Sequence, residues 1–248
     1  MTEQIGVVKV DNTSVIVPGG NAANCQFGFC RTETPAQNQN ITFMETGTTI
    51  LHLSVMRDTG KSLNTSHEYQ FPFLGVPTGG GLFPRRRRGQ TKYFSQNHVF
   101  STSTGTPFTI PTASPDSAYS DNICILDFSN KAIYSSPFPA DGSWTNLAIQ
   151  VYWKALTLAV FASQGALPLI EAEGPRGHLA ANTTLKAVTG LVHSEGVPSS
   201  PAGQGGFHFG VLKYSIADPN DSASASNTSH SGSQEGSTDG LFFSGVFV

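Results

Sequence analysis

The sequence has few charged residues, which make up only 12% of its 248 positions. Soluble domains typically carry about 25%. Long surface helices are usually solubilised by Lys and Glu, so this scarcity disfavours helices and favours strands joined by turns. The net charge of −3 and the pI near 6.1 also provide no overall field that would attract nucleic acid or an anionic membrane.

Cysteine is scarce too, and its spacing predicts no metal centre. The three cysteines are Cys25, Cys30 and Cys124. A zinc site needs further Cys or His ligands at short offsets, and none flank Cys25 and Cys30. We therefore expect reduced, buried thiols and no metal or other cofactor.

Long apolar runs are missing. Residues 156–170 form the most apolar window, but Ser163, Gln164 and Gly165 interrupt it, and it is shorter than the roughly 20 residues that span a bilayer. The N-terminal stretch MTEQIGVVKV lacks the basic start and apolar run of a secretory signal. We expect no membrane insertion and a cytoplasmic or non-classically secreted protein. We attribute the six N-x-[ST] sequons to the high Ser, Thr and Asn content.

Recognisable catalytic motifs are absent as well. The sequence has no G-x-S-x-G nucleophile turn, no phosphate-binding glycine loop, no H-E-x-x-H and no spaced pair of carboxylates. His178 lies near Glu171 and Glu173, but the Gly-Pro turn beside it indicates an exposed loop. The sequence therefore predicts a protein that is not an enzyme.

What the sequence does contain is a series of short apolar segments with strand-like alternation. They predict an all-β fold, an antiparallel β-sandwich or jelly roll with long loop insertions. We expect the first two segments to pair as a hairpin. The C-terminal segment should return to the core, because its exposure to water would cost several kcal/mol. The segments are residues 5–10, 14–17, 25–30, 41–44, 49–56, 122–128, 131–134, 146–153, 156–161, 166–170, 185–192, 206–216 and 241–248.

The chain is expected to form one domain over residues 1–248, since its 17 Phe residues are enough to build a core. Two stretches interrupt the strand pattern. Residues 71–120 contain many prolines and a glycine run, which predict a long insertion. Residues 219–240 are rich in Ser, Asn and Gly, which predict a flexible loop.

One segment resembles a known family. Residues 40–57, NITFMETGTTILHLSVMR, are similar to the central strands of fungal galectins, where an apolar strand, a glycine turn and a Leu-His-x-x-x-Arg strand carry sugar contacts. The likeness covers about the first 70 residues and returns faintly at residues 132–144. It implies a galectin-like lectin that binds glycans on a β-sheet face. The carbohydrate contacts that the resemblance implies are His52, Arg57, Asn64 and Trp144.

These side chains suit sugar recognition, because His, Asn and Arg donors converge on hydroxyl groups while a Trp ring packs on the apolar face of the sugar. Arg57 departs from the galectin pattern. It follows His52 by five residues instead of four, so a flat strand would turn it to the other face. A bulge at residues 55–57 would restore it.

The densest charge is the run Arg85, Arg86, Arg87 and Arg88. Clustered guanidinium groups grip phosphate or sulfated glycans bidentately, which predicts an anion-binding site. A protease processing site is one alternative, and a solvated loop or subunit contact is another.

The sequence therefore predicts a non-enzymatic, carbohydrate-binding homo-oligomer with glycans as its partners. The alternative is a jelly-roll structural subunit of a viral capsid or appendage. Low charge, abundant Ser, Thr and Asn, and an apolar C-terminal strand also suit a surface buried against identical neighbours. Only that alternative involves nucleic acid and a location in the virion.

Overall fold

The computed structural model describes residues 4–17, 25–35, 47–75, 98–108, 120–127, 131–153, 155, 157–176, 206–216, 234 and 237–247. Within these ranges the chain forms thirteen strands and no helix, so none of the described segments is a helix that could cross a membrane. Every pairing between the strands is antiparallel, in two sheets. The predicted all-β, antiparallel sandwich is confirmed.

One sheet has six strands in the order β1-β13-β4-β9-β10-β11. Its strands are β1 (Gly6–Val10), β13 (Asp239–Phe247), β4 (Thr48–Arg57), β9 (Thr145–Tyr152), β10 (Thr157–Gln164) and β11 (Ile170–Arg176).

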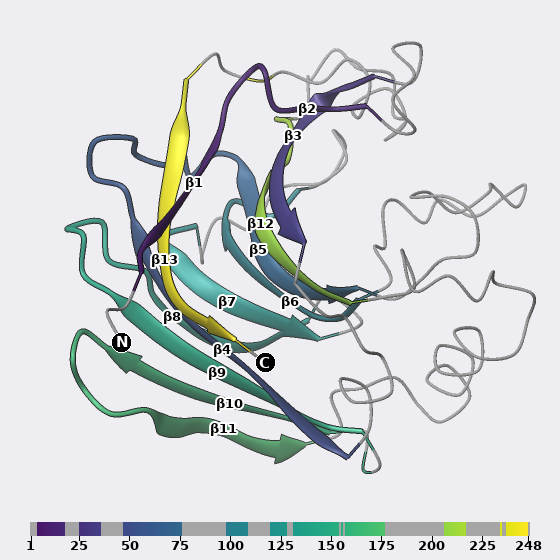
Figure 1. Ribbon diagram of the computed structural model, residues 1–248, viewed down its shortest axis with the longest axis vertical. Helices are drawn as coiled ribbons and strands as arrows, with labels where there is room; N and C mark the ends of the chain where they lie inside the picture. The colour runs from purple at the N-terminus through teal and green to yellow at the C-terminus, as the bar shows by residue number, and fades with distance from the viewer. Residues whose placement is uncertain are drawn as a thin grey trace, which may run out of the picture.

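The other sheet has seven strands in the order β2-β3-β12-β5-β6-β7-β8. It arcs along its strands, and its concave side faces away from the six-stranded sheet (Figure 1). Its strands are β2 (Val15–Ile16), β3 (Gln26–Pro35), β12 (Gly206–Lys213), β5 (Glu68–Gly75), β6 (His98–Gly105), β7 (Asn122–Asp127) and β8 (Ala132–Pro137).

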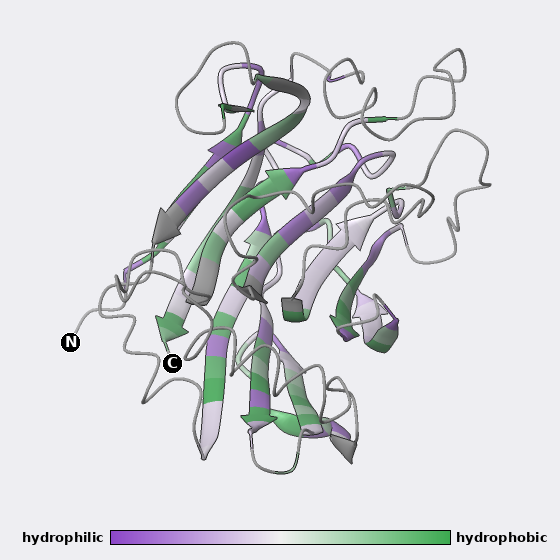
Figure 2. Cartoon of the chain, turned by 90° about the vertical axis from the view of Figure 1, so that its right-hand side faces the viewer, coloured by the Kyte–Doolittle hydropathy of each residue, from purple (hydrophilic) through white to green (hydrophobic). Residues whose placement is uncertain are grey.

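The core lies between the sheets and follows from the two-residue period of the strands. Along β4, buried residues alternate with partly exposed ones, and bands of opposite hydropathy mark several strands in Figure 2. Both sheets contribute to one cluster of buried apolar side chains. The C-terminal strand returns to this core as expected, since Leu241 and Phe243 on β13 are buried.

The expected hairpin of the first two segments is wrong. β1 pairs with β13 in the six-stranded sheet, whereas β2 pairs with β3 in the seven-stranded sheet. The chain changes sheets at a turn in which the Asp11 carboxylate accepts a hydrogen bond of 2.8 Å from the Thr13 N–H. Such Asx turns redirect the backbone without strand pairing between the flanking residues.

The expected insertion at residues 71–120 needs correction, because this stretch contains the end of β5 and all of β6. Both strands lie inside the sheet. Pro72 is tolerated in β5 because the register with β6 shifts between Phe71 and Phe73, where the proline's missing N–H interrupts no ladder. Residues 76–97 and 109–119 lie outside the described part.

Other sequence predictions fall largely on residues that the structure does not describe. These include the strands expected at 41–44 and 185–192 and most of the loop expected at 219–240, of which Asp239 and Gly240 begin β13. The single-domain organisation stays a prediction. Cys30 and Cys124 are buried, and Cys25 is partly buried.

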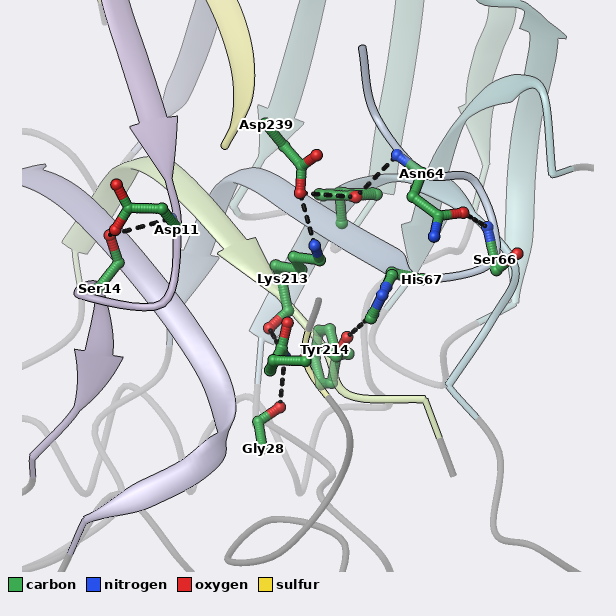
Figure 3. Close-up of polar contacts among 11 residues, drawn as sticks. Asp11, Ser14, Gly28, Asn64, Ser66, His67, Lys213, Tyr214 and Asp239 are labelled. Atoms are coloured by element: carbon green, nitrogen blue, oxygen red, sulfur yellow. Dashed lines mark hydrogen bonds and ion pairs between the residues drawn. The ribbon is translucent and has the colours of Figure 1, made fainter. Parts of the chain in front are cut away.

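A polar cluster crosses the interior between the two sheets. Lys213 on β12 points at Asp239 on β13 (Figure 3), with 2.6 Å between Nζ and Oδ2. The Tyr69 hydroxyl donates to the same carboxylate oxygen at 3.1 Å and accepts the Asn64 N–H at 3.0 Å. The cluster therefore ties the loop before β5 to both sheets.

Candidate functional site

The outer face of the six-stranded sheet carries His52, the central residue of the resemblance. His52 lies on β4 opposite Phe247 of β13, and the two rings stack with centroids 4.5 Å apart. Burial lowers the pKa of the imidazole. One ring face of His52 is therefore already occupied by a protein side chain.

Arg57 does not join His52. β4 keeps an unbroken register against β13 from Ser54 to Arg57, so no bulge restores the side chain to the face of His52. Arg57 points into the sandwich and is 7% exposed. Its guanidinium lies 4.8 Å from the centroid of the Phe138 ring and forms an ion pair of 3.5 Å with Asp121.

Asn64 and Trp144 are also separate from His52. Asn64 binds Tyr69, whose hydroxyl reaches Asp239 at the start of β13, while His52 pairs with Phe247 near the end of that strand. Asp239 and Phe247 are eight residues apart along β13, a distance of about 25 Å in an extended strand, so Asn64 lies far from His52. Trp144 directly precedes β9 and is half-buried. Arg85, Arg86, Arg87, Arg88 and His178 lie outside the described residues.

The concave face of the seven-stranded sheet presents a different set of side chains. Strand registers align one residue from each of six neighbouring strands in a row across this face, and most of the row is polar. The row is Arg31 (β3), Leu212 (β12), Gln70 (β5), Ser103 (β6), Cys124 (β7) and Ser135 (β8).

A small aromatic cluster borders this row. Phe29, Tyr214 and Phe108 contact one another with ring centroids 5.3 to 6.0 Å apart, and Leu212 packs with them. Phe29 and Tyr214 are buried although they lie outside the main core. The cluster forms an apolar wall beside the polar row.

Glu68 stands between the aromatic wall and the polar row. It begins β5 two residues before Gln70, so both side chains project from the same face of the strand. Its Oε2 accepts a 2.6 Å hydrogen bond from the Phe108 N–H, and its Oε1 lies 3.5 Å from the Gln70 amide nitrogen.

The environment of Glu68 favours its protonated form. Burial raises the pKa of this carboxyl above its usual value near 4.5, and the bonds from Phe108 and Gln70 offset only part of that rise. The other resolved shifts among the described carboxylates, at Asp11 and Asp141, lower the pKa. A carboxyl with a raised pKa holds its proton to higher pH, which suits a general acid.

Glu33 is a second acidic residue on the concave face. It pairs with Arg31 on the same strand. Within the described part of the chain, no group of three or more His, Cys, Asp or Glu side chains is arranged to hold a metal ion. The face therefore offers one acid with a raised pKa, an ion pair and a row of hydrogen-bonding groups.

The chain matches a known protein family over most of its length. The model of the glycoside hydrolase 131 catalytic N-terminal domain matches residues 1–78 and 90–248. The chain belongs to this glycoside hydrolase family. No curated protein sequence matches it.

Two solved structures of the glycoside hydrolase 131 family share the fold. The β-glucanase catalytic domain from Podospora anserina is similar with a TM-score of 0.60 and 19% identity, over 98% of this chain and 70% of that one. The family 131 catalytic domain from Coprinopsis cinerea gives a TM-score of 0.55 and 16% identity, over 97% of this chain and 67% of that one.

The glycoside hydrolase family overturns the functional predictions from the sequence. The non-enzymatic lectin, the galectin resemblance and the capsid alternative are all replaced by a family of catalytic domains. The β-sandwich implied by the resemblance is retained. A central strand that carries a His can occur in β-sandwiches of different function, so the galectin-like segment indicates the fold and not the activity.

Glu68 was missed because a search for short catalytic motifs does not detect a single carboxylate on a strand. A usable signal was present in Glu68-Tyr69-Gln70-Phe71, where polar and apolar residues alternate with a period of two. This pattern predicts a strand with a polar face, but Pro72 directly afterwards favoured a loop. Recognising a register shift at the proline requires the neighbouring strand.

Proposed function

We propose that the protein is a glycoside hydrolase that cleaves β-glucan chains on the concave face of the seven-stranded sheet, with Glu68 as its general acid. Membership of a glycoside hydrolase family supports hydrolysis, and the Podospora anserina relative is named a β-glucanase. The single observation that carries the assignment of Glu68 is a partly buried carboxyl on that face, held by the Phe108 N–H at 2.6 Å in surroundings that raise its pKa.

The chemistry is a proton transfer coupled to bond cleavage. The Glu68 carboxyl gives its proton to the glycosidic oxygen as the bond from this oxygen to the anomeric carbon breaks, so the leaving sugar departs as an alcohol. A water molecule adds to the anomeric carbon and loses its proton to a base. Glu68 regains a proton from solvent before the next cycle.

The rest of the face fits a glycan as the substrate. Hydroxyl groups in the row, on Ser103 and Ser135, can hydrogen-bond to sugar hydroxyls. The apolar wall beside Glu68 lowers the local dielectric, which favours the neutral acid and strengthens polar contacts.

The test is hydrolysis of a panel of β-glucans by the wild type and by Glu68→Gln. Reducing ends released from β-1,3-, β-1,4- and mixed-linkage glucans are measured. Glu68→Gln should lose at least about 100-fold in kcat, the usual contribution of a general acid. The matched control is Glu171→Gln, the same change on exposed β11 of the other sheet, which should keep wild-type activity.

The outcomes separate two claims. A wild type that releases no sugar from any β-glucan contradicts the proposed substrate. Hydrolysis that survives Glu68→Gln undiminished contradicts the assignment of the acid. Assembly into homo-oligomers remains a separate proposal, based on the low surface charge, and size-exclusion chromatography with light scattering tests it.

A further inference from the structure

The two oxygens of Glu68 have different roles because of their partners. Oε2 accepts the Phe108 N–H at 2.6 Å. A protonated carboxyl oxygen is a poor acceptor, so this short bond holds Oε2 as the carbonyl oxygen of the neutral acid. The proton therefore belongs on Oε1, which is the oxygen next to Gln70.

Gln70 is buried yet incompletely paired. Its side chain is 5% exposed, and its amide oxygen has no hydrogen-bond partner. Burying an unsatisfied acceptor is costly, so such a group in a folded protein calls for an explanation. The other end of the amide, Nε2, lies 3.5 Å from Glu68 Oε1.

An amide is the side chain that can serve both protonation states of an acid. Its N–H donates to a charged carboxylate oxygen, and its carbonyl oxygen accepts from a protonated one. Turning the terminal torsion by half a turn exchanges the two groups, and this torsion is broad in glutamine. The unpaired Gln70 oxygen is the acceptor that the neutral form of Glu68 would need.

We propose that Gln70 is a positioning residue for Glu68, whose amide donates to the charged Oε1 and turns to accept the proton of the neutral Oε1. The assignment rests on the proposed function only in naming Glu68 as the acid. Gln70 then sets the direction of the acidic proton before the substrate binds, and it has a bond to offer Glu68 in both protonation states.

The other titratable groups that face Glu68 keep one charge state while the carboxyl titrates. They are Tyr214, which directly follows β12, and Cys124 from β7, and burial raises the pKa of both. Arg31 from β3 acts electrostatically on Tyr214. Phe108 supplies only a backbone N–H. Gln70 is thus the neighbour whose side chain can change its bond as Glu68 gains or loses its proton.

The test compares Gln70→Met and Gln70→Glu with the wild type. Methionine keeps the length without a donor or an acceptor. The charged form of Glu68 then loses the stronger of the two bonds, so its pKa rises. Glutamate adds a second carboxyl that shares one proton with Glu68, so the pKa rises further. The readouts are the pH profile of kcat/KM and a carboxyl ¹³C titration, with the Glu68 signal assigned by its loss in Glu68→Gln.

Gln70→Met should move the alkaline limb of the profile to higher pH and lower kcat about tenfold with little change in KM, because the acid loses its orientation. The matched control is Gln150→Met on β9 of the other sheet, which should leave both readouts unchanged. Unchanged alkaline limbs and unchanged Glu68 titrations in both Gln70 variants would overturn the proposal.

The ¹³C titration keeps this result distinct from failure of the proposed function. It needs no substrate, so it reports the coupling of Gln70 to Glu68 even if the wild type hydrolyses no β-glucan. If Gln70→Met does not fold, as judged by circular dichroism, the isosteric Gln70→Glu carries the same comparison.

Discussion

Lys213 and Asp239 face each other in the interior between the two sheets, with Nζ 2.6 Å from Oδ2 and both side chains 1% exposed. Each belongs to a different sheet, so the pair connects the two layers. Buried charges are costly unless they are paired, and the Tyr69 hydroxyl adds a further bond to the same carboxylate.

Removing one member of this pair should destabilise the fold strongly. Lys213→Met leaves the Asp239 carboxylate buried and uncompensated, which typically costs about 3–5 kcal/mol. The double variant Lys213→Met/Asp239→Leu should recover most of that loss, because no unpaired charge remains. Guanidinium denaturation measures the free energies of unfolding. A single variant that loses less than about 1 kcal/mol would contradict this account.

Glu68→Gln should stabilise the protein at neutral pH. The folded pKa of Glu68 is raised above its usual value near 4.5, so the folded state holds its proton more tightly than the unfolded state. Stability is therefore lost as pH rises from about 4.5 through the folded pKa. Glutamine is always neutral and should add about 1 kcal/mol at pH 7.

Urea denaturation of Glu68→Gln and of the wild type at several pH values between about 3.5 and 8 measures the two free energies of unfolding. The two unfolding free energies should converge below the unfolded pKa, where the carboxyl is protonated in both states. A difference that stays constant over the whole range would show that titration of Glu68 is not its origin.

Arg57→Lys should weaken the fold without affecting hydrolysis. Lysine keeps the charge but loses the planar guanidinium that lies over Phe138 and contacts Asp121. The expected loss is about 1–2 kcal/mol in thermal or chemical unfolding. The side chain points into the sandwich, so kcat and KM should stay at wild-type values. A raised KM with unchanged stability would instead support Arg57 as a sugar contact.

His52 should act through its contact with Phe247. His52→Ala removes the ring stack, worth about 0.5–1.5 kcal/mol, whereas His52→Phe preserves it. Burial lowers the folded pKa of His52 below 6.5, so its contribution to stability is present above pH 6.5 and is lost as pH falls through the folded pKa. Thermal unfolding from pH 4 to 8 should show a smaller acid loss for His52→Phe than for the wild type.

The fold could be predicted from the sequence where one face of a strand is buried. The β4 and β9 segments alternate strongly, and their boundaries were anticipated within one or two residues. β6 was missed because its sequence, HVFSTSTG, places Ser and Thr on both faces, and only the neighbouring strands satisfy them. The order of strands in a sheet is harder to predict than the strands themselves, because it depends on pairings such as that of β1 with β13 at the opposite end of the chain.

The site could not be predicted, because its residues are not close in sequence. Glu68, Phe108 and Tyr214 come from three distant segments, and the raised pKa of Glu68 arises only when those segments bury it. The residues near His52 form one continuous segment, which a sequence pattern can reveal. Continuity in sequence is a property of a strand, whereas a reaction centre on a sheet is assembled across strands.

Tyr69 lies between Glu68 and Gln70 and points to the opposite side of β5, where it is bound to Asp239. The Tyr69 hydroxyl is thus hydrogen-bonded to β13, while Glu68 and Gln70 on either side of it face the concave surface. Deletion of the C-terminal residues through Asp239 would therefore remove this support behind Glu68 together with the buried ion pair, so a changed pH optimum should accompany the loss of stability.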